Sequence, residues 1–353
     1  MFLFENRRQA NAPYAGLLFS EPLQEIICWD PKKLHAILLV LDALRRAGYY
    51  LAGCLSYEAG YVLRDLSYLL ERTAAKTCAQ ASVPLLHFFA FKAPSRLTAS
   101  AIDTFLGQQY PVRFKNLKLN LTAGEYAAAF DRVRAHIIAG DTYQVNLTAQ
   151  YEFDYEGRSR DVYQILRARQ QVPYSAWLEL PGYDVLSLSP ELFFSKVKNK
   201  LYAKPMKGTM PRADDCMQDK ANQDFLTTDL KSRAENTMIV DLLRNDLSAI
   251  STPGSVQVSN LLSIESYETV HQMTSSIESE VAVDLNFSEI ITALFPCGSI
   301  TGVPKRRTME IIHALERAPR HIYTGAIGYI TPENDMCFNV PIRTLLCRDN
   351  HGI

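Results

Sequence analysis

Apolar residues repeat at helical spacing in two early segments of the chain, residues 31–47 and 122–140. A period of three to four residues places such side chains on one face of an amphipathic helix. The second segment starts with Thr122 and Glu125, which have the spacing of a capping box, and it stops at Gly140. Four apolar residues form the face that we expect this helix to bury: Tyr126, Phe130, Val133 and Ile137.

From residue 175 onward, short apolar runs are separated by turn residues, a pattern typical of strands in hairpins. We predict three or four strands here: Ser175–Leu180, Val185–Ser189, Leu192–Lys196 and Leu201–Lys204. Further helices and closing strands are expected in this order: a helix over 220–250, either continuous or broken, helices over 286–295 and 304–317, then strands over 325–330 and 337–347. Antiparallel runs with intervening helices favour an α+β fold of layered antiparallel β-sheets with outer helices.

The apolar pattern loosens between residues 92 and 121, where Pro94, Gly107 and Pro111 interrupt it. We interpret this stretch as a linker or domain boundary. The predicted organisation is therefore an N-terminal α/β region with its linker over residues 1–117, followed by a catalytic domain over residues 118–353.

Charge and composition narrow the class of ligand. The 353 residues carry 37 basic and 38 acidic side chains, a net charge of -1, which gives no electrostatic footprint for nucleic acid. The longest apolar run, residues 36–41, is far too short to cross a membrane. Seven scattered cysteines with no Cys-x-x-Cys pair fit a reducing compartment. We expect a cytoplasmic protein that binds a small molecule.

The segment of residues 204–212 places Lys207 in a stiff loop between Pro205 and Gly208. One interpretation is a surface turn with a solvated lysine, since lysine is mostly exposed. The other is a reacting amine paired with Glu191, which lies sixteen residues earlier beside a proline. A carboxylate and an amine at adjacent strand ends suit a general acid and a nucleophile.

Two further segments are candidates for ligand binding. Glu235 lies in an acidic and apolar helix over residues 234–246 and is a possible ligand for a hard cation such as magnesium. The glycine-containing loop 297–305 precedes a helix and favours an anion such as a carboxylate. Simple N-capping of that helix by Ser299 or Thr301 is an equal alternative.

Two other segments are interpreted as structural. The tyrosine-rich stretch 56–61 favours a packing corner, because aromatic side chains are chiefly core residues. The lone His271 beside Gln272 favours a histidine with satisfied hydrogen bonds.

The motifs, taken in order, resemble those of the chorismate-utilising enzymes over roughly residues 122–347. The matching stretches are Gly-Asp-x-Tyr-Gln-Val-Asn-Leu at 140–147, Ser-Pro-Glu at 189–191, Pro-Met-Lys-Gly-Thr-Met-Pro-Arg at 205–212, Glu-Asn-x-Met-Ile-Val-Asp-Leu-Leu-Arg-Asn-Asp-Leu at 235–247, Gly-Ser-Ile-Thr-Gly-Val-Pro-Lys at 298–305 and Tyr-x-Gly-x-x-Gly-Tyr at 323–329. The resemblance implies the fold of anthranilate synthase component I. Lysine at 207, where anthranilate synthase large subunits have alanine, resembles component I of aminodeoxychorismate synthase.

The resemblance also implies a reaction and its partners. Chorismate and ammonia would give 4-amino-4-deoxychorismate for 4-aminobenzoate and folate synthesis. A separate glutamine amidotransferase subunit, component II, would supply the ammonia, since no glutaminase motif occurs in this chain. Lys207 would form a covalent adduct, Glu191 would act as the acid, and Glu235 would be one of two glutamates that hold magnesium. Six residues match positions that line the chorismate pocket: Thr209, Gln272, Ser299, Gly302, Tyr323 and Arg343.

The sequence stops at residues 351–353, inside a turn that in the family leads to a Gly-rich strand and a helix. That helix carries the second magnesium glutamate, so we expect a shortened chain. Two alternatives to the amination enzyme stay open. One is an anthranilate synthase-like enzyme, and the other is a catalytically impaired scaffold that still docks the amidotransferase.

Overall fold

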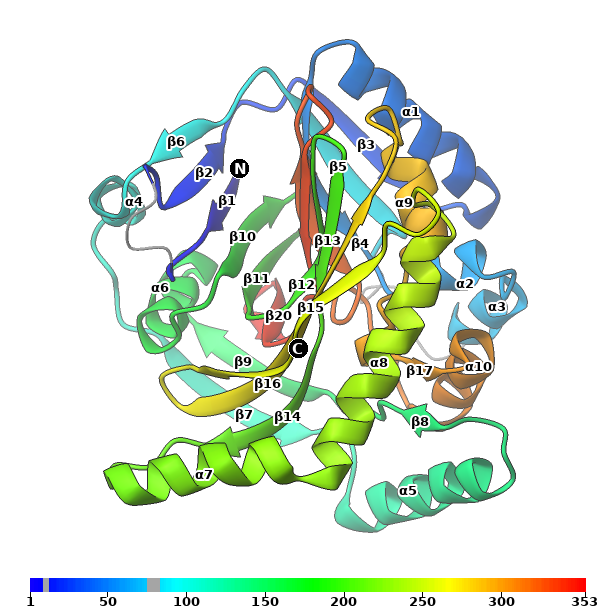
Figure 1. The fold of residues 1–353 in the computed structure, drawn as a ribbon. Coiled ribbons are helices and arrows are strands. Elements are labelled where there is room, and N and C mark those ends of the chain that lie inside the picture. Colours follow the sequence, from blue (N-terminus) through cyan, green and yellow to red (C-terminus); the bar gives the residue numbers. More distant parts are fainter. Residues whose placement is uncertain (9–12, 75–82) are drawn as a thin grey trace.

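Two large antiparallel sheets face each other in the computed structural model, which describes residues 1–8, 13–74 and 83–353 (Figure 1). The nine-stranded sheet runs, in spatial order, through β6 (Ser95–Leu97), β2 (Gly16–Phe19), β1 (Phe2–Glu5), β10 (Tyr174–Leu180), β11 (Tyr183–Ser189), β20 (Thr344–Arg348), β21 (His351–Gly352), β9 (Tyr151–Glu156) and β7 (Arg113–Leu119). The ten-stranded sheet runs through β14 (Met206–Pro211), β16 (Val270–Glu280), β13 (Lys200–Lys204), β12 (Leu192–Val197), β19 (Met336–Asn339), β18 (Ala326–Ile330), β4 (Tyr50–Leu55), β5 (Leu86–Phe91) and β3 (Gln24–Cys28), with β15 (Gln257–Ser266) paired to β16.

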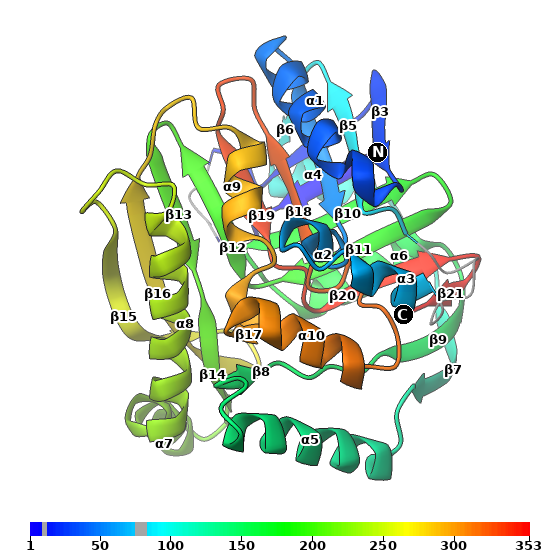
Figure 2. The same ribbon diagram turned by 90° about the vertical axis from the view of Figure 1, so that its right-hand side faces the viewer.

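Helices cover the outer faces of both sheets (Figures 1 and 2). The helices are α1 (Leu34–Arg46), α2 (Ala59–Leu63), α3 (Tyr68–Ala74), α4 (Ala99–Leu106), α5 (Ala123–Ile138), α6 (Ser159–Arg169), α7 (Cys216–Thr228), α8 (Leu230–Ser248), α9 (Phe287–Leu294) and α10 (Lys305–Leu315). Helices α1, α8 and α9 lie outside the ten-stranded sheet, and α4 and α6 lie outside the nine-stranded sheet. No helix within the described ranges is long and apolar enough to cross a membrane.

Three apolar cores hold these layers together. One lies between the ten-stranded sheet and its helices, around Phe88, Phe287 and Phe338. A second lies between the two sheets and is rich in aromatic rings, with Phe19 and Phe91 centroids 5.2 Å apart. The third fills the space under α4 and α6. The predicted α+β fold of layered antiparallel sheets with outer helices is therefore confirmed.

Both sheets combine strands from the two ends of the chain. Strand β1 pairs with β10, where Phe4 lies opposite Ala176, and β4 pairs with β18, where Cys54 lies opposite Ile327. The organisation into residues 1–117 and 118–353 stays a prediction, and any such division runs through shared sheets.

Several local expectations differ from the structure. Residues 92–121 are more ordered than a linker, because β6, α4 and β7 lie there. The strand expected over 337–347 is two strands, β19 and β20, in different sheets. Between them the chain turns at Arg343, which has a φ of 52°. The apolar residues of the segment 337–347 alternate with the same period in both strands, so the segment resembled one strand.

The apolar face expected for α5 is mostly exposed. The capping box of Thr122 and Glu125 is present, but only Val133 of the four face residues is buried. Tyr126, Phe130 and Ile137 expose between 40% and 50% of their surface. A hydrophobic period identifies a stripe on a helix, but the tertiary arrangement decides what covers it.

Strands β17 (Gly302–Val303) and β8 (Gln144–Val145) pair to form a third, small sheet. This pairing connects the loop before α10 to the segment after α5. It brings together two of the segments identified from the sequence.

Candidate functional site

Lys207 lies in β14, at a bulge where the pairing with β16 shifts register between Met206 and Thr209. The next residue, Gly208, has a φ of 94°, and a Cβ atom there would lie 2.8 Å from the Cβ of Ser232 on α8. Glycine is therefore required both for the backbone conformation and for the close approach of α8. The bulge places the lysine beside α8 and not in a free surface turn.

Burial lowers the pKa of Lys207, because desolvation disfavours the ammonium form. The negative charges of Glu191 and Glu235 oppose this effect. Desolvation is the larger influence, so the amine is more easily deprotonated than a solvated lysine. This environment supports the interpretation of Lys207 as a reacting amine over that of a solvated turn residue.

Glu191 lies in the turn between β11 and β12 and is 3% exposed. Burial raises its pKa to about 7, opposed by the Ser299 hydroxyl, the Lys207 charge and the backbone at Met206. Its Oε1 atom is buried and has no hydrogen-bond partner among the described residues. A buried carboxyl group with a free oxygen next to a lysine is suited to hold and release a proton.

Glu235 lies in the second turn of α8, a helix whose N-cap is Asp229, with Oδ2 accepting from the Ser232 amide at 2.8 Å. Its side chain is about one-third exposed, and its nearest cationic partner is Lys231 at 3.9 Å. The described residues contain no cluster of three or more histidine, cysteine, aspartate or glutamate side chains able to hold a metal. Glu235 thus offers one carboxylate from the protein.

The loop before α10 brings Ser299 against Glu191. Ser299 is buried in a short 3-10 helix, Gly298–Ile300, and its Oγ lies 3.2 Å from the Cys297 Sγ. The alternative of an N-cap by Ser299 or Thr301 is wrong, because Pro304 is the N-cap of α10 and makes no side-chain cap hydrogen bond. The Thr301 hydroxyl instead donates to the Cys297 carbonyl at 3.0 Å.

Gly302 allows this loop to pack directly on strand β8, which contains Gln144. A Cβ atom at Gly302 would lie 1.9 Å from the Gln144 carbonyl oxygen, and its φ is 145°. Lys305 anchors the other end of the loop by donating to Asp246 of α8 at 2.7 Å and to the Leu294 carbonyl at 2.8 Å. The loop is therefore held against β8 at Gly302 and against α8 at Lys305.

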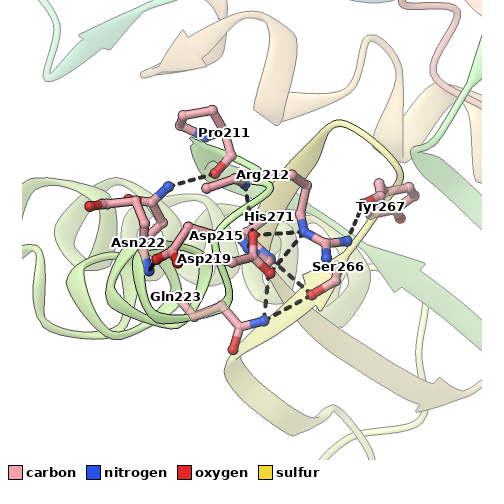
Figure 3. Close-up of polar contacts among 11 residues, drawn as sticks. Pro211, Arg212, Asp215, Asp219, Asn222, Gln223, Ser266, Tyr267 and His271 are labelled. Atoms are coloured by element: carbon pink, nitrogen blue, oxygen red, sulfur yellow. Dashed lines mark hydrogen bonds and ion pairs between the residues drawn. The ribbon is translucent and has the colours of Figure 1, made fainter.

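Thr209 and Gln272 meet across the β14–β16 pair, where the Gln272 amide donates to the Thr209 hydroxyl at 2.8 Å. Next to them, His271 is fully buried and hydrogen-bonded on both ring nitrogens (Figure 3). Its Nε2 lies 2.9 Å from Asp219, and its Nδ1 lies 2.8 Å from the Ser266 hydroxyl. The structural interpretation of His271 is confirmed.

Tyr323 and Arg343 line one cavity of about 360 Å³, between β20 and the chain leading into β9. The Arg343 Nη1 donates to the Gln170 amide oxygen at 3.0 Å, and burial lowers the pKa of the Arg343 guanidinium. Burial also raises the pKa of Tyr323, and Glu191 is one of the charges that act on it. Glu191 therefore acts on one lining residue, Tyr323, although neither Glu191 nor Lys207 lines the cavity.

Arg320 is a buried residue of this region that the sequence interpretation missed. Its guanidinium donates to the Ile300 carbonyl at 2.8 Å and to Glu316, and it lies 4.6 Å from the centroid of the Tyr57 ring. It also donates to the Asn146 carbonyl at 2.6 Å. Arg320 thus joins the Ser299 loop to the segment after α5. The i, i+4 spacing of Glu316 and Arg320 was the available signal.

The tyrosine-rich stretch 56–61 proves to be the packing corner expected from the sequence. Tyr57 is fully buried beneath Arg320, and Tyr57 and Tyr61 contact edge to face with centroids 5.7 Å apart. Glu58 accepts from the Arg320 amide at 2.9 Å. The corner therefore supports the residue that holds the site loops.

Comparison with known proteins reveals the family. A family model described as chorismate binding enzyme matches residues 2–353. The chain belongs to the chorismate binding enzyme family. It is 40% identical over 226 residues to aminodeoxychorismate synthase component 1 of Salmonella typhimurium, covering 64% of this chain and 50% of the relative. It is 34% identical over 236 residues to anthranilate synthase component 1 of Aquifex aeolicus, covering 67% and 48%.

The solved structure of anthranilate synthase component I from Streptococcus pneumoniae is similar to this chorismate-binding chain in fold. The TM-score is 0.77 at 22% identity, and the match covers 97% of this chain and 86% of that one. The expected resemblance to the anthranilate synthase component I fold is confirmed. The chain spans about half the length of the curated relatives it matches.

Proposed function

We propose that this chain carries the amination site of an aminodeoxychorismate synthase component 1. Chorismate and ammonia would give 4-amino-4-deoxychorismate and water, for 4-aminobenzoate and folate synthesis. The observation that carries the proposal is the pairing of Lys207 with Glu191, in which burial favours the neutral form of both groups. The similarity to the Salmonella relative supports this reaction over others in the family.

Lys207 is the nucleophile in this proposal. Its neutral amine adds to C2 of chorismate while the bond between C4 and its hydroxyl oxygen breaks. The protonated Glu191 gives its proton to the departing oxygen, so that water leaves instead of hydroxide. The product of this step is a C2 adduct with a positively charged secondary amine and an ionised Glu191.

Ammonia then attacks C4, and the bond between C2 and the Lys207 nitrogen breaks to return a neutral lysine. The new ammonium group at C4 gives one proton to Glu191, which restores the starting state of the protein. A glutamine amidotransferase partner supplies the ammonia in the full reaction. Free ammonium salts are expected to replace it, because only ammonia enters the chemical step.

Six residues are proposed to bind the substrate. Arg343 has the planar fork that grips a carboxylate, and it lines the same cavity as Tyr323. Thr209 of β14 and Gln272 of β16 form a hydrogen-bonded pair two residues along from Lys207, and we assign this pair to the substrate ring. Ser299, whose hydroxyl acts on Glu191, and Gly302 of the same loop are assigned to the opposite side of the substrate.

Magnesium is the proposed cofactor, held by Glu235. Magnesium commonly takes one or two carboxylates and completes its shell with substrate oxygens and water. The partly exposed carboxylate of Glu235 fits that use, with the remaining ligands coming from chorismate and solvent. When bound, the ion neutralises substrate carboxylate charge. We expect Glu235→Gln to raise the magnesium concentration needed for half-maximal activity.

The decisive test is incubation with chorismate, magnesium and an ammonium salt, followed by mass analysis of the products. We expect 4-amino-4-deoxychorismate from the native chain. Lys207→Ala should abolish both product and covalent adduct, while Lys200→Ala, at an exposed ion pair with Glu280, should retain both. Anthranilate and pyruvate as products would contradict the assignment. Chorismate binding with no turnover would favour the impaired scaffold.

A further inference from the structure

Asn236, on α8 directly after Glu235, is a buried amide that touches the main chain of the lysine strand. Its side chain is fully buried. The Nδ2 atom donates to the Lys207 carbonyl at 3.4 Å and to the Met273 carbonyl at 3.2 Å. The Oδ1 atom accepts from the Ser275 hydroxyl at 2.6 Å. Both amide hydrogens and the amide oxygen of Asn236 therefore have partners in β14 or β16.

The location of these contacts is informative, because the β14–β16 ladder is irregular there. Met206 pairs with Thr274 and Thr209 pairs with Gln272, but the register shifts between them. Lys207 and Gly208 lie within this bulge. A bulged residue is not positioned by ladder hydrogen bonds, so another group must fix its direction. Asn236 is the side chain that reaches the Lys207 carbonyl from the helix.

The same contact sets the distance between the lysine strand and α8. Gly208 lets the helix approach, since any side chain there would meet Ser232 and Leu226. Asn236 then bridges β14 and β16 from the helix side. Because Glu235 precedes Asn236, one helical turn fixes both the carboxylate that acts on Lys207 and the Lys207 main chain.

We propose that Asn236 is a positioning residue that holds the main chain of Lys207 in the bulge and so fixes the direction in which its amine points. The inference rests on the proposed function in taking Lys207 as the reacting amine. It adds a residue that does not contact the substrate, and it assigns that residue to the chemical step and not to substrate binding.

Two variants test the role. Asn236→Asp keeps the size of the side chain and its acceptor for Ser275 and cannot donate to the two carbonyls, but its negative charge also raises the pKa of a nearby lysine. Asn236→Leu removes all polar contacts. Asn222→Leu is the matched control, because the buried Asn222 amide donates to the Pro211 carbonyl at 2.9 Å at the far end of the same strand.

The first measurement needs no substrate. Each folded variant is acetylated over a range of pH, and labelling of the Lys207 peptide is quantified by mass. A lysine released from its buried position should titrate closer to its ordinary value of 10.5. We expect the labelling midpoint to move up by half a pH unit or more in both Asn236 variants and to stay unchanged in Asn222→Leu. An unchanged midpoint in Asn236→Leu, which adds no charge, would overturn the proposal.

The second measurement separates positioning from binding. We expect kcat for chorismate amination to fall by tenfold or more in Asn236→Leu, with KM for chorismate within about twofold of native. A rise in KM at constant kcat would contradict the proposal. If native protein makes no aminated product but the midpoint still moves in Asn236→Leu, positioning holds and the proposed function fails. If native protein is active and the midpoint does not move, only the positioning role fails.

Discussion

Burial shifts the pKa values of Lys207 and Glu191 in opposite directions. It lowers the pKa of the amine and raises the pKa of the carboxyl group to about 7. Each shift favours the neutral form, because both ionised forms are poorly solvated beneath the Ser299 loop. Burial thus shifts both groups toward the protonation states that a nucleophile and an acid require.

Glu191→Gln tests this pairing through the pH profile of amination. An acid with a pKa of about 7 is progressively lost as pH rises through 7, so the native rate should fall there. The variant should lose that limb, and its rate should drop by about 10² to 10⁴-fold, the usual contribution of a general acid. Above pH 7, where native Glu191 is ionised, removal of its charge should also lower the Lys207 pKa further. A native-like alkaline limb in the variant would contradict the role.

Glu58 makes stability depend on pH. Burial raises its pKa from 4.5 to about 7 in the folded protein, and it is 6% exposed. The unfolded chain ionises first, so stability is complete below pH 4.5 and falls as pH rises toward 7, by about 3 kcal/mol. Glu58→Gln should remove this share of the slope in urea titrations at several pH values. Glu333→Gln, at an exposed turn, should leave the slope unchanged.

The sequence identified the residues that carry charge more readily than those that place them. Lys207, Glu191 and Glu235 stand in distinctive motifs. The side chains of Asn236 and Arg320 donate to backbone carbonyl groups, and because every residue has such a group, the sequence does not reveal the partner. The Lys207 carbonyl that Asn236 reaches is 29 positions away. Only the tertiary arrangement reveals which carbonyl an amide or guanidinium meets.

Helix α8 is the element on which the site is assembled. It carries Glu235 and Asn236 toward β14 and β16, and its later turns support the Ser299 loop. Gly298 of that loop packs on Leu242, where a Cβ atom would lie 2.4 Å from Cδ2. The helix predicted over 220–250, for which a break is one of the expected forms, is two helices that meet at Asp229, which caps α8. The side-chain cap at Asp229 fixes where the second helix begins.

The contact between Gly298 and Leu242 predicts strong coupling between two substitutions. Gly298→Ala should destabilise the protein by about 1 to 3 kcal/mol through overpacking. Leu242→Ala makes room for the added methyl group, so the double variant should be more stable than the sum of the single effects implies, by about 1 kcal/mol. Urea unfolding of the four proteins measures this coupling. Gly124→Ala, where a Cβ meets nothing within 4 Å, should be additive with Leu242→Ala. Additivity in the first pair would show that the loop moves freely away from α8.

At the scale of the whole molecule, the sheets were predictable in kind but not in connection. The hairpins of β10 to β13 follow from turn residues close in sequence. The pairing of β1 with β10 and of β4 with β18 joins segments more than 150 residues apart, and no local pattern specifies such partners. For the same reason, the separation of β19 from β20 into different sheets was not visible in one continuous apolar run.

These shared sheets determine how the chain should unfold. Two independent units joined near residue 117 would unfold in two steps. Strands β1 and β4 instead complete sheets whose other strands lie after residue 117, and the aromatic core between the sheets draws on both segments. We therefore expect one cooperative transition in urea. The two tryptophans suit this test, because Trp29 is half exposed before α1 and Trp177 is buried in β10.

A fragment of residues 118–353 gives the complementary test. Without β1 and β4, strands β10 and β18 lose partners on one edge, and side chains such as Leu178 and Ile327 lose part of their cover. Unpaired edges and exposed apolar area oppose folding. We expect this fragment to bind a hydrophobic dye and to lack a cooperative transition, and co-expression with residues 1–117 to restore the native transition. A fragment that unfolds cooperatively by itself, together with separate transitions for the Trp29 and Trp177 signals in the whole chain, would establish an autonomous domain that begins near residue 118.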